Sequence, residues 1–369
     1  MLTLALVGAG HAHLAVLARA DRLRASGIEP VLIAPATFDY SGLASAILSG
    51  AMAPDAGRID VAAVAERNGI AHAVTEVVGM DQARRRLTLG DGSVRSFDLV
   101  SFNIGSVVAA AAPGVEPGSP GVWPVKPLSS LFALRRALEA AFAAGEPTPA
   151  IAVVGDGPTG FEIAAALTGL HERHGRTANL SLIGPHADAR WAPGGAGRAL
   201  TRNLDRRGVC RLAGRFRTFE PGRIALCDGR TRACDHLVVA TGLQAPALTR
   251  AAGLPLDDRG RFKLAPILCS VGDDRLFAAG DCATIKGWPR PFAGVFGVRA
   301  APVLLDNLCA SGRGEQPRPY RPQTRWLSIM DLGEGTGLAM RGGLWWQGRL
   351  VLALKRRLDL GFVARSRAG

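Results

Sequence analysis

Two glycines near the start of the chain, Gly8 and Gly10, are the first residues whose spacing suggests chemistry. They separate the apolar run Leu2–Val7, which is typical of a buried strand, from apolar residues that recur with a helical period. In such a strand–turn–helix unit, the first glycine allows a tight turn and the second lets a phosphate approach the backbone. The helix N-terminus adds free N–H groups and the positive end of the helix dipole. We expect Gly8, Gly10 and the first helical residues, His11 and Ala12, to bind the pyrophosphate of a dinucleotide.

The same pattern occurs a second time, after the apolar run Ile151–Val154. Its glycines, Gly155, Gly157 and Gly160, complete the three-glycine fingerprint of a dinucleotide-binding unit, whereas the first copy has His13 at the third position. The third glycine allows the helix to pack closely on the strand. His13 must therefore either widen that packing or point outward.

Matched spacings continue downstream of both copies. Asp91 is followed seven residues later by Asp98 and after seven more by Gly105, and the second half repeats these spacings from Asp228 to Gly242. Both Asp91 and Asp228 begin Asp-Gly pairs between short strand-like runs, which predict hairpins. We therefore expect an α/β fold of two Rossmann-like units, each with a small antiparallel ribbon before its last strand, related by duplication.

Composition limits the class of protein. The 369 residues are 48% apolar and 20% charged, which is typical of a globular protein, and the length allows two or three domains. No apolar stretch reaches the roughly 18 residues of a membrane-spanning helix. The first residues lack the basic segment of a signal peptide, so we expect a cytoplasmic protein. The net charge of +13 favours anionic partners, but no nucleic-acid-binding motif accompanies it, and we expect no nucleic-acid partner.

The six cysteines have no C-x-x-C spacing, which argues against a metal finger or an adjacent redox dithiol. We expect no metal site. The cysteines are Cys210, Cys227, Cys234, Cys269, Cys282 and Cys309.

A third element completes a recognisable set. Leu276–Ala283 has the pattern of a strand that ends in Gly280-Asp281. With the two glycine loops and Ala240-Thr241-Gly242, it resembles the pyridine nucleotide-disulfide oxidoreductase superfamily, flavoproteins with two dinucleotide-binding domains. The resemblance covers nearly the whole chain. It implies FAD in the first unit, with Asp281 bonded to the ribityl hydroxyls, and NAD(P)H in the second unit.

This resemblance also implies a glutathione-reductase-like arrangement, in which the NAD(P) domain is inserted into the FAD domain. The expected FAD domain comprises residues 1–122 and 246–310, and the expected NAD(P) domain comprises residues 123–245. Residues 311–369 form a last segment that opens with an extended, proline-rich connector. Proline-rich joints at Pro113–Pro127 and Pro246–Pro255 agree with these boundaries.

Four segments resemble type II NADH dehydrogenases, and resemble still more the flavoprotein domain that is fused to selenophosphate synthetase. They are Phe38–Gly50, Val125–Pro127, Ala293–Leu304 and Trp326–Gly333.

The resemblance places further residues at the flavin. Ser41 approaches the flavin region, although a plain Ser-Gly turn explains it equally, and Gly105 permits close approach to FAD. A helix that starts at Gly294 would aim its N-terminus at the flavin pyrimidine edge and stabilise negative charge there. Gly294 and Val295 would line the pocket for the second substrate. The remaining expected FAD contacts are Gly280, Ala34, Pro35 and Val78.

Neither unit has the usual acid for the adenosine ribose. The second strand of the first unit ends at Ala34-Pro35, so that contact must differ or come from the backbone. In the second unit Gly184-Pro185-His186 follows the strand, and Arg190 is the nearest candidate for binding a 2′-phosphate. NADH and NADPH stay alternatives, as does weak or absent nucleotide binding. We expect Gly155, Gly157, Gly160 and Gly242 to contact the nucleotide.

Lys126 and Glu162 are the candidate catalytic residues. In relatives, the position of Lys126 lies near the flavin face on which the nicotinamide stacks; a surface lysine is the alternative. Glu162, on the first turn of a helix, could orient the nicotinamide carboxamide, or it could be an acid stabilised by the helix dipole.

The C-terminal segment is strongly basic, with eleven Lys and Arg against four Asp and Glu over residues 311–369. Leu350, Leu354, Leu358 and Phe362 recur every four residues after Trp345-Trp346. Such a basic amphipathic helix would meet the inner face of an anionic membrane as a peripheral element, or close the FAD domain as a packed helix. A homodimer is a further partner to consider.

The sequence therefore predicts an FAD-dependent oxidoreductase that passes hydride from NAD(P)H to FAD and on to a quinone-like or other small acceptor. One alternative is a low-turnover, flavin-binding partner or regulatory protein linked to selenium handling. Another is a sulfide:quinone reductase-like enzyme, which needs a cysteine pair near the flavin; no such pair is evident.

Overall fold

The structure is a computed structural model that describes residues 1–109, 115 and 118–368. Its largest sheet has eight strands, and five consecutive strands at one end of the sheet are parallel. Two separate parts of the chain contribute strands to this sheet, because β22 from the last third of the chain pairs with β9 from the first third. In spatial order the strands are β23 (Ala283–Ile285), β20 (Phe262–Leu264), β21 (Cys269–Ser270), β22 (Asp273–Ala278), β9 (Leu99–Phe102), β1 (Leu2–Val7), β2 (Ile28–Ile33) and β5 (Ala71–Ala73).

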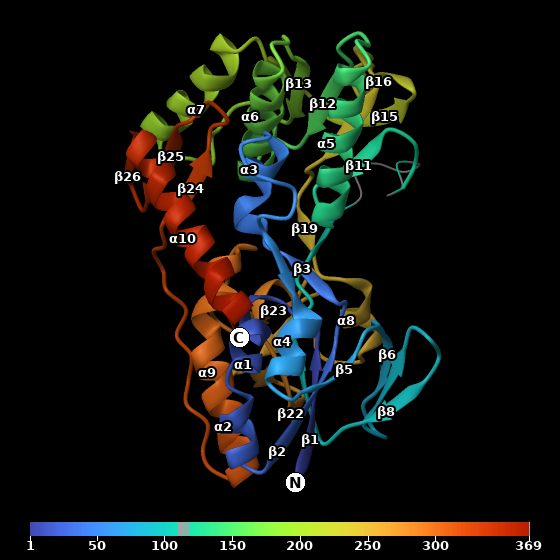
Figure 1. Ribbon diagram of the computed structural model, residues 1–369, viewed down its shortest axis with the longest axis vertical. Helices are drawn as coiled ribbons and strands as arrows, with labels where there is room; N and C mark the ends of the chain where they lie inside the picture. The colour runs from blue at the N-terminus through green and yellow to red at the C-terminus, as the bar shows by residue number, and fades with distance from the viewer. Residues whose placement is uncertain (110–114, 116–117, 369) are drawn as a thin grey trace.

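Helices cover this sheet, so its central strands are buried on both faces. The long helix α9 (Gly294–Arg313) packs along α1 (His11–Leu17) and α2 (Ala20–Ala25), and α4 (Val61–Arg67) packs beside β5. These elements make up the lower half of the molecule in Figure 1.

A second sheet of five parallel strands forms the core of the upper half (Figure 1). The chain enters and leaves it between β9 and β20, so the second unit is inserted into the first, which confirms the predicted α/β fold with two Rossmann-like units. The precise domain boundaries stay predictions. The sheet order is β11 (Val122–Pro124), β18 (His236–Val239), β12 (Ala150–Val154), β13 (Asn179–Gly184) and β14 (Cys210–Ala213), with helices α5 (Leu128–Ala143), α6 (Pro158–Arg173) and α7 (Gly194–Arg206).

Both units carry the predicted antiparallel ribbon. Gly92 and Gly229 take positive φ angles of 81° and 88° in the turns between the last two strands of each ribbon, where a Cβ would be strained. The ribbons are β6 (Val77–Asp81), β7 (Arg86–Leu89) and β8 (Val94–Ser96) in the first unit, and β15 (Phe216–Glu220), β16 (Gly222–Leu226) and β17 (Thr231–Cys234) in the second.

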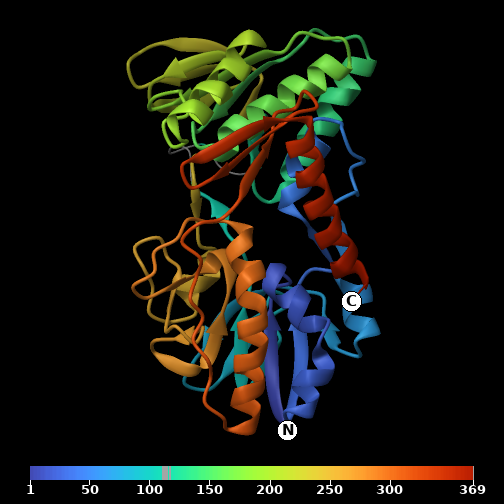
Figure 2. The ribbon, with the colours of Figure 1, turned by 90° about the vertical axis from the view of Figure 1, so that its left-hand side faces the viewer.

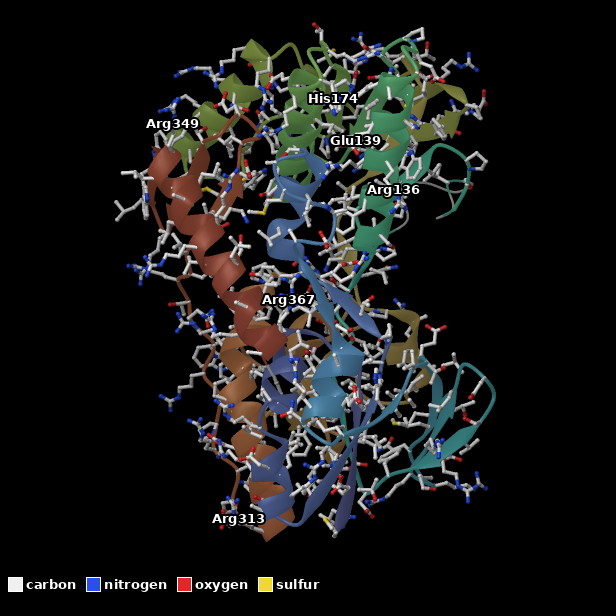
Figure 3. The ribbon with its side chains drawn as sticks, in the orientation of Figure 1. Arg136, Glu139, His174, Arg313, Arg349 and Arg367 are labelled. Atoms are coloured by element: carbon white, nitrogen blue, oxygen red, sulfur yellow. The ribbon has the colours of Figure 1, made fainter. Side chains whose placement is uncertain are left out.

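The last segment contains a sheet that the sequence analysis did not predict. Its strands are β24 (Ser328–Asp331), β25 (Gly337–Arg341) and β26 (Leu344–Gly348), and helix α10 (Arg349–Ala368) follows directly. The sheet packs on the second unit and α10 then runs toward the first, so this segment bridges the two units (Figure 2). Figure 3 labels Arg349 and Arg367 at the two ends of α10. No helix within the described residues has the length and apolar character needed to cross a membrane.

Shorter elements complete the chain. Helix α3 packs on α5 and α6, so a piece of the first unit reaches the second. The elements are β3 (Thr37–Asp39), η1 (Ser41–Leu43), α3 (Ala44–Leu48), β4 (Arg58–Asp60), β10 (Val107–Val108), β19 (Leu243–Gln244), α8 (Ala247–Ala251) and η2 (Gly280–Cys282).

The helices that follow the two glycine loops are spaced differently from their strands. In the second unit, a Cβ at Gly160 would lie 1.7 Å from the Gly155 carbonyl oxygen, so α6 touches the loop backbone. In the first unit the buried His13 ring fills the corresponding space, with Nδ1 2.6 Å from the Gly8 carbonyl oxygen and Nε2 2.8 Å from Ser101 Oγ. A carbonyl only accepts, so Nδ1 carries the proton and Nε2 accepts from Ser101. His13 therefore points inward and widens the packing.

This histidine makes stability depend on pH. Burial lowers the pKa of His13 from 6.5 to about 4, so between these values the unfolded chain binds more protons than the folded one. The stability associated with neutral His13 is complete above pH 6.5 and falls as the pH drops toward 4. We expect His13→Gln to remove this contribution, which amounts to about one proton in the slope of the free energy of unfolding against pH. Urea unfolding measured across this pH range tests the expectation, and a slope equal to that of the wild type would contradict it.

Candidate functional site

A cavity of about 630 Å³ opens at the carboxyl ends of the first unit's central strands and extends to helix α6 of the second unit. Gly8, Gly10, Gly280 and Asp281 line it from the first unit, and Glu162 lines it from the second. Ligands of open α/β sheets bind outside the carboxyl ends of the strands, so this is the position in which a dinucleotide is expected.

Asn103, at the end of β9, connects the loops that surround this cavity. Its Oδ1 accepts hydrogen bonds from the backbone N–H groups of Ala12 (2.9 Å) and His13 (3.1 Å), and its Nδ2 donates to the Ala279 carbonyl (2.7 Å). Its own carbonyl accepts from the N–H of Gly10 at 3.1 Å. One residue therefore holds the loops after β1 and β22 to the end of β9.

This arrangement requires the glycines. A Cβ at Gly10 would lie 2.6 Å from Asn103 Oδ1, and one at Gly280 would lie 2.7 Å from Asn103 Nδ2. The sequence pattern assigned Asn103 no role. Its buried amide was not recognisable as a link between loops because its partners lie about ninety and more residues away in the chain.

Charged side chains offer little for a pyrophosphate here. Lys126 is the one Lys or Arg among the cavity-lining residues of the described chain, whereas Asp39, Glu76, Glu162 and Asp281 supply acids. A diphosphate would therefore depend on the loop N–H groups that Asn103 does not occupy and on the N-terminal dipole of α1. The glycine loop, which admits no Cβ, fits that requirement.

Asp281 and Lys126 meet in a small polar network. Ser106 Oγ donates to Asp281 Oδ2 at 2.7 Å, and Lys126 Nζ donates to Ser106 Oγ at 2.7 Å and to Asp281 Oδ2 at 3.3 Å. All three side chains line the cavity, and the Lys126 and Asp281 side chains are 26% and 12% exposed. Ser106 belongs to no motif in the sequence. The network fixes the Asp281 carboxylate at one oxygen, Oδ2, so that Oδ1 can accept from a ligand hydroxyl.

Glu162 lies where three parts of the chain meet. Its Oε1 accepts from Ser45 Oγ at 2.8 Å and from the Asp331 N–H at 3.0 Å. Burial raises the pKa of Glu162, and the nearby Lys355 charge opposes that shift. Glu162 is thus a half-buried carboxyl on the cavity wall whose proton affinity is increased. Its partners come from α3, β24 and α10, and the sequence contained no signal that brings these together.

Helix α10 closes this side of the site. The Tyr40 ring stacks on Phe362 with centroids 4.6 Å apart, and its hydroxyl donates to Asp359 Oδ1 at 2.9 Å. Lys355 Nζ donates to Asp359 Oδ2 at 2.8 Å and to the Gly42 carbonyl. The Tyr40-Ser41-Gly42 loop is therefore held by the C-terminal helix, which sequence analysis offered as one of two roles for that helix.

The His11 ring lies inside the same aromatic cluster. Its centroid is 5.3 to 5.4 Å from the rings of Phe38, Tyr40 and Phe362. Burial lowers the pKa of His11 to about 4, so the ring is neutral at physiological pH. His11 therefore presents a neutral polar edge to the cavity that it lines.

The structure separates the expected FAD residues into two groups. Most of them line the cavity: Gly8, Gly10, His11, Ala34, Pro35, Ser41, Gly105, Gly280, Asp281 and Gly294, with the catalytic candidates Lys126 and Glu162. Three do not. Ala12 donates its N–H to Asn103. Val78 is 49% exposed, and its neighbour Val77 lines the cavity instead. Gly294 and Gly297 line the cavity, but Val295 does not. Strand and helix alternation turns Val78 and Val295 away from it.

The second glycine loop lies outside this cavity, at the start of α6. Gly155 and Gly160 are closely packed, since Cβ atoms there would lie 2.1 Å from the Ala240 carbonyl oxygen and 1.7 Å from the Gly155 carbonyl oxygen. Gly157 and Gly242 have no heavy atom within 4 Å of a Cβ position among the described residues. No side chain caps α6, so its first N–H groups are available to a ligand.

None of the six cysteines lines the cavity in the described part of the chain. Cys282, the nearest in sequence to Asp281, is fully buried, and burial raises the pKa of its thiol to about 12. A thiol in that state is a poor nucleophile. Across the described ranges, no group of three or more His, Cys, Asp or Glu side chains is arranged to hold a metal ion.

Two Rossmann-like units, one inserted in the other, with a cavity between them define a class of protein that binds two dinucleotides. Comparison with known proteins gives the same result. The family model described as "Pyridine nucleotide-disulphide oxidoreductase" matches residues 2–297, and the chain belongs to this family. FAD and NAD(P)H are the cofactors of this family of oxidoreductases, and they are the cofactors of this chain.

A curated relative agrees with membership of this family. A protein named NADH dehydrogenase-like in Mycobacterium tuberculosis (strain H37Rv) is 30% identical over 243 residues, which are 62% of this chain and 59% of that protein. This chain therefore matches less than two thirds of the curated relative's length.

Solved structures share the fold at lower identity. The sulfide:quinone oxidoreductase of Aquifex aeolicus superposes with a TM-score of 0.81 at 14% identity, over 100% of this chain and 92% of that chain. An NAD-dependent persulfide reductase from A. fulgidus gives 0.74 at 18% identity, over 92% and 64%. At these identities the likeness is one of fold.

The Asn103 link predicts a specific loss. In Asn103→Ala, the N–H groups of Ala12 and His13 and the Ala279 carbonyl lose their partner, so we expect the free energy of unfolding to fall by about 1–3 kcal/mol. We also expect bound FAD to fall below stoichiometry, measured by absorbance after gel filtration. Asn203→Ala is the matched control, because Asn203 is a buried asparagine on α7 outside the cavity lining. It should keep FAD at full stoichiometry, and full FAD occupancy in Asn103→Ala would contradict the assigned role.

Proposed function

We propose that this protein is an FAD-dependent oxidoreductase that passes hydride from NAD(P)H to FAD and on to a quinone-like or other small acceptor. One observation carries the proposal: the cavity that holds the first glycine loop and Asp281 is also lined by Thr159 and Glu162 of α6. The uncapped N-terminus of α6, which suits a nucleotide diphosphate, therefore adjoins the cavity suited to FAD.

The flavin supplies the redox chemistry when bound, since it accepts a hydride and releases electrons. The residues of this chain would hold and tune it. Asp281 Oδ1 is placed to accept from a ribityl hydroxyl, while Ser106 and Lys126 fix the other carboxylate oxygen. The N-terminus of α9, which begins at Gly294 on the cavity wall, adds a positive dipole end that favours negative charge.

Two groups are suited to positioning and proton transfer. Glu162 has an elevated pKa, and its Oε2 makes no hydrogen bond among the described residues, so it can donate or accept a proton or orient a carboxamide. The Tyr40–Phe362 pair and the Lys355–Asp359 pair close the side next to α10 and exclude water.

The electron acceptor is the less constrained part of the proposal. A sulfide:quinone reductase-like reaction is the second candidate, on the likeness of fold alone, but the buried Cys282 and the positions of the other five cysteines do not favour it. A low-turnover flavin-binding partner linked to selenium handling is the third.

Anaerobic titration tests this function. Stoichiometric NADH or NADPH should bleach the yellow FAD-loaded protein, and menadione should restore the colour with steady nucleotide oxidation. Asp281→Ala should lose FAD and, with it, this activity. If neither nucleotide bleaches the bound flavin, the oxidoreductase proposal fails and the flavin-binding partner is favoured.

We also propose that the protein is peripheral on the inner face of a membrane, which would bring it to a quinone. Helix α10 is amphipathic in the structure: Val351, Leu352 and Val363 are buried, whereas Leu350 and Leu358 are 86% and 51% exposed. Next to it, Leu344, Trp345 and Trp346 of β26 are 72%, 39% and 41% exposed. Apolar residues with interfacial tryptophans beside basic side chains are typical of membrane-surface elements.

Vesicle flotation tests the membrane proposal. The double variant Leu350→Asp/Leu358→Asp should bind anionic vesicles at least about tenfold more weakly, because each buried leucine contributes about 1.5–3 kcal/mol. Val94→Asp is the matched control, since Val94 is 53% exposed on the distant ribbon strand β8. Unchanged binding of the α10 variant would refute the proposal. A third outcome is that the wild type does not bind vesicles but forms a dimer, which the α10 variant converts to a monomer. That outcome would assign this surface to a homodimer.

A further inference from the structure

The second unit raises a question about its nucleotide. Rossmann units for NAD normally carry an acid at the end of the second strand, which hydrogen-bonds the adenosine ribose, and units for NADP accommodate the 2′-phosphate with an Arg nearby. Here the corresponding strand, β13, ends at Gly184 and continues into Pro185. The strand end itself therefore offers neither group.

The missing carboxylate is supplied by the glycine loop. A Cβ built on Gly184 would lie 2.4 Å from Asp156 Cγ and 2.7 Å from Asp156 Oδ2. The Asp156 side chain thus occupies the space into which a side chain at the end of β13 would project. Asp156 stands between Gly155 and Gly157, so one residue belongs to the diphosphate loop and reaches the ribose end of the site.

The position of Asp156 is well determined. Its Oδ2 accepts hydrogen bonds from the N–H groups of His186 (2.9 Å) and Ala187 (2.8 Å), which anchors the loop after β13. Trp191 Nε1 donates to the Asp156 carbonyl at 2.9 Å. Oδ1 makes no hydrogen bond within the described residues, so it remains able to accept from a ligand hydroxyl.

Three cations near the end of β13 already have acidic partners. Arg190 is paired with Asp188 at 3.0 Å, Arg211 is paired with Asp205 at 2.6 Å, and Arg230 is paired with Asp228 at 2.7 Å. A 2′-phosphate would meet the Asp156 charge. A ribose diol would meet an acceptor.

We propose that Asp156 selects NADH over NADPH, by accepting a hydrogen bond from the adenosine ribose and repelling a 2′-phosphate. The inference rests on the proposed function, because it concerns the nucleotide of that reaction. It makes Asp156 a specificity-determining residue, whereas Arg190, the nearest candidate in the sequence for binding a 2′-phosphate, pairs with Asp188 on the surface.

Calorimetry of the FAD-loaded protein with ADP-ribose and with 2′-phospho-ADP-ribose measures this preference without any turnover. The wild type should bind ADP-ribose at least about tenfold more tightly, and Asp156→Asn should remove most of that ratio. Asparagine keeps an oxygen that can accept from the backbone N–H groups, so the loop should stay folded. Arg190→Ala is the control and should leave the ratio unchanged.

Several results would overturn the inference: tighter binding of the phosphorylated ligand by the wild type, a ratio unaffected in Asp156→Asn, or a large change in Arg190→Ala. Anaerobic bleaching by NADH and NADPH distinguishes this failure from that of the proposed function. Selective ADP-ribose binding without bleaching would support Asp156 and reject the oxidoreductase. Bleaching by both nucleotides alike would support the oxidoreductase and reject Asp156.

Discussion

The side-chain amide of Asn103 is the contact on which the first unit's site depends. It joins the end of β9 to the N-terminus of α1 and to the loop after β22, and those three segments form one wall of the cavity. An amide can do this because it donates and accepts at once. The bonds within the protein hold these loops in place, so ordering them costs a ligand little entropy. The same amide explains why Gly10 and Gly280 tolerate no side chain.

The two units share a plan and differ in how they complete it. In the first, His13 spaces α1 from its strand and Asn103 occupies two of the first N–H groups. In the second, Gly160 lets α6 touch the loop backbone, and the helix end carries no side-chain cap. An enclosed, internally bonded loop suits a retained FAD, and an open one suits a nucleotide that must exchange.

The C-terminal segment links the two units. Glu162 of α6 accepts from Ser45 of α3 and from the β24 backbone, while Lys355 and Asp359 of α10 hold the loop at Tyr40. The lysine stabilises both carboxylates, because the buried Asp359 charge would be costly without a partner. One side of α10 is committed to this junction, which leaves its exposed leucines for another surface.

The sequence by itself determined the fold. Two glycine loops with matched downstream spacings, and Gly280-Asp281 after an apolar run, predicted two Rossmann-like units, because strand burial and tight turns leave a local signature. It also identified the residues that the turns themselves present to the cavity, such as Gly8, Gly10 and Asp281. Only the tertiary structure decided which side chains complete the site. Asn103, Ser106, Ser45, Lys355 and Asp156 act through partners from other elements, and a contact between distant segments leaves no mark in local spacing. Val78 and Val295, which do not line the cavity, show a related limit: the direction of a side chain depends on the register of its element, which a short motif does not define.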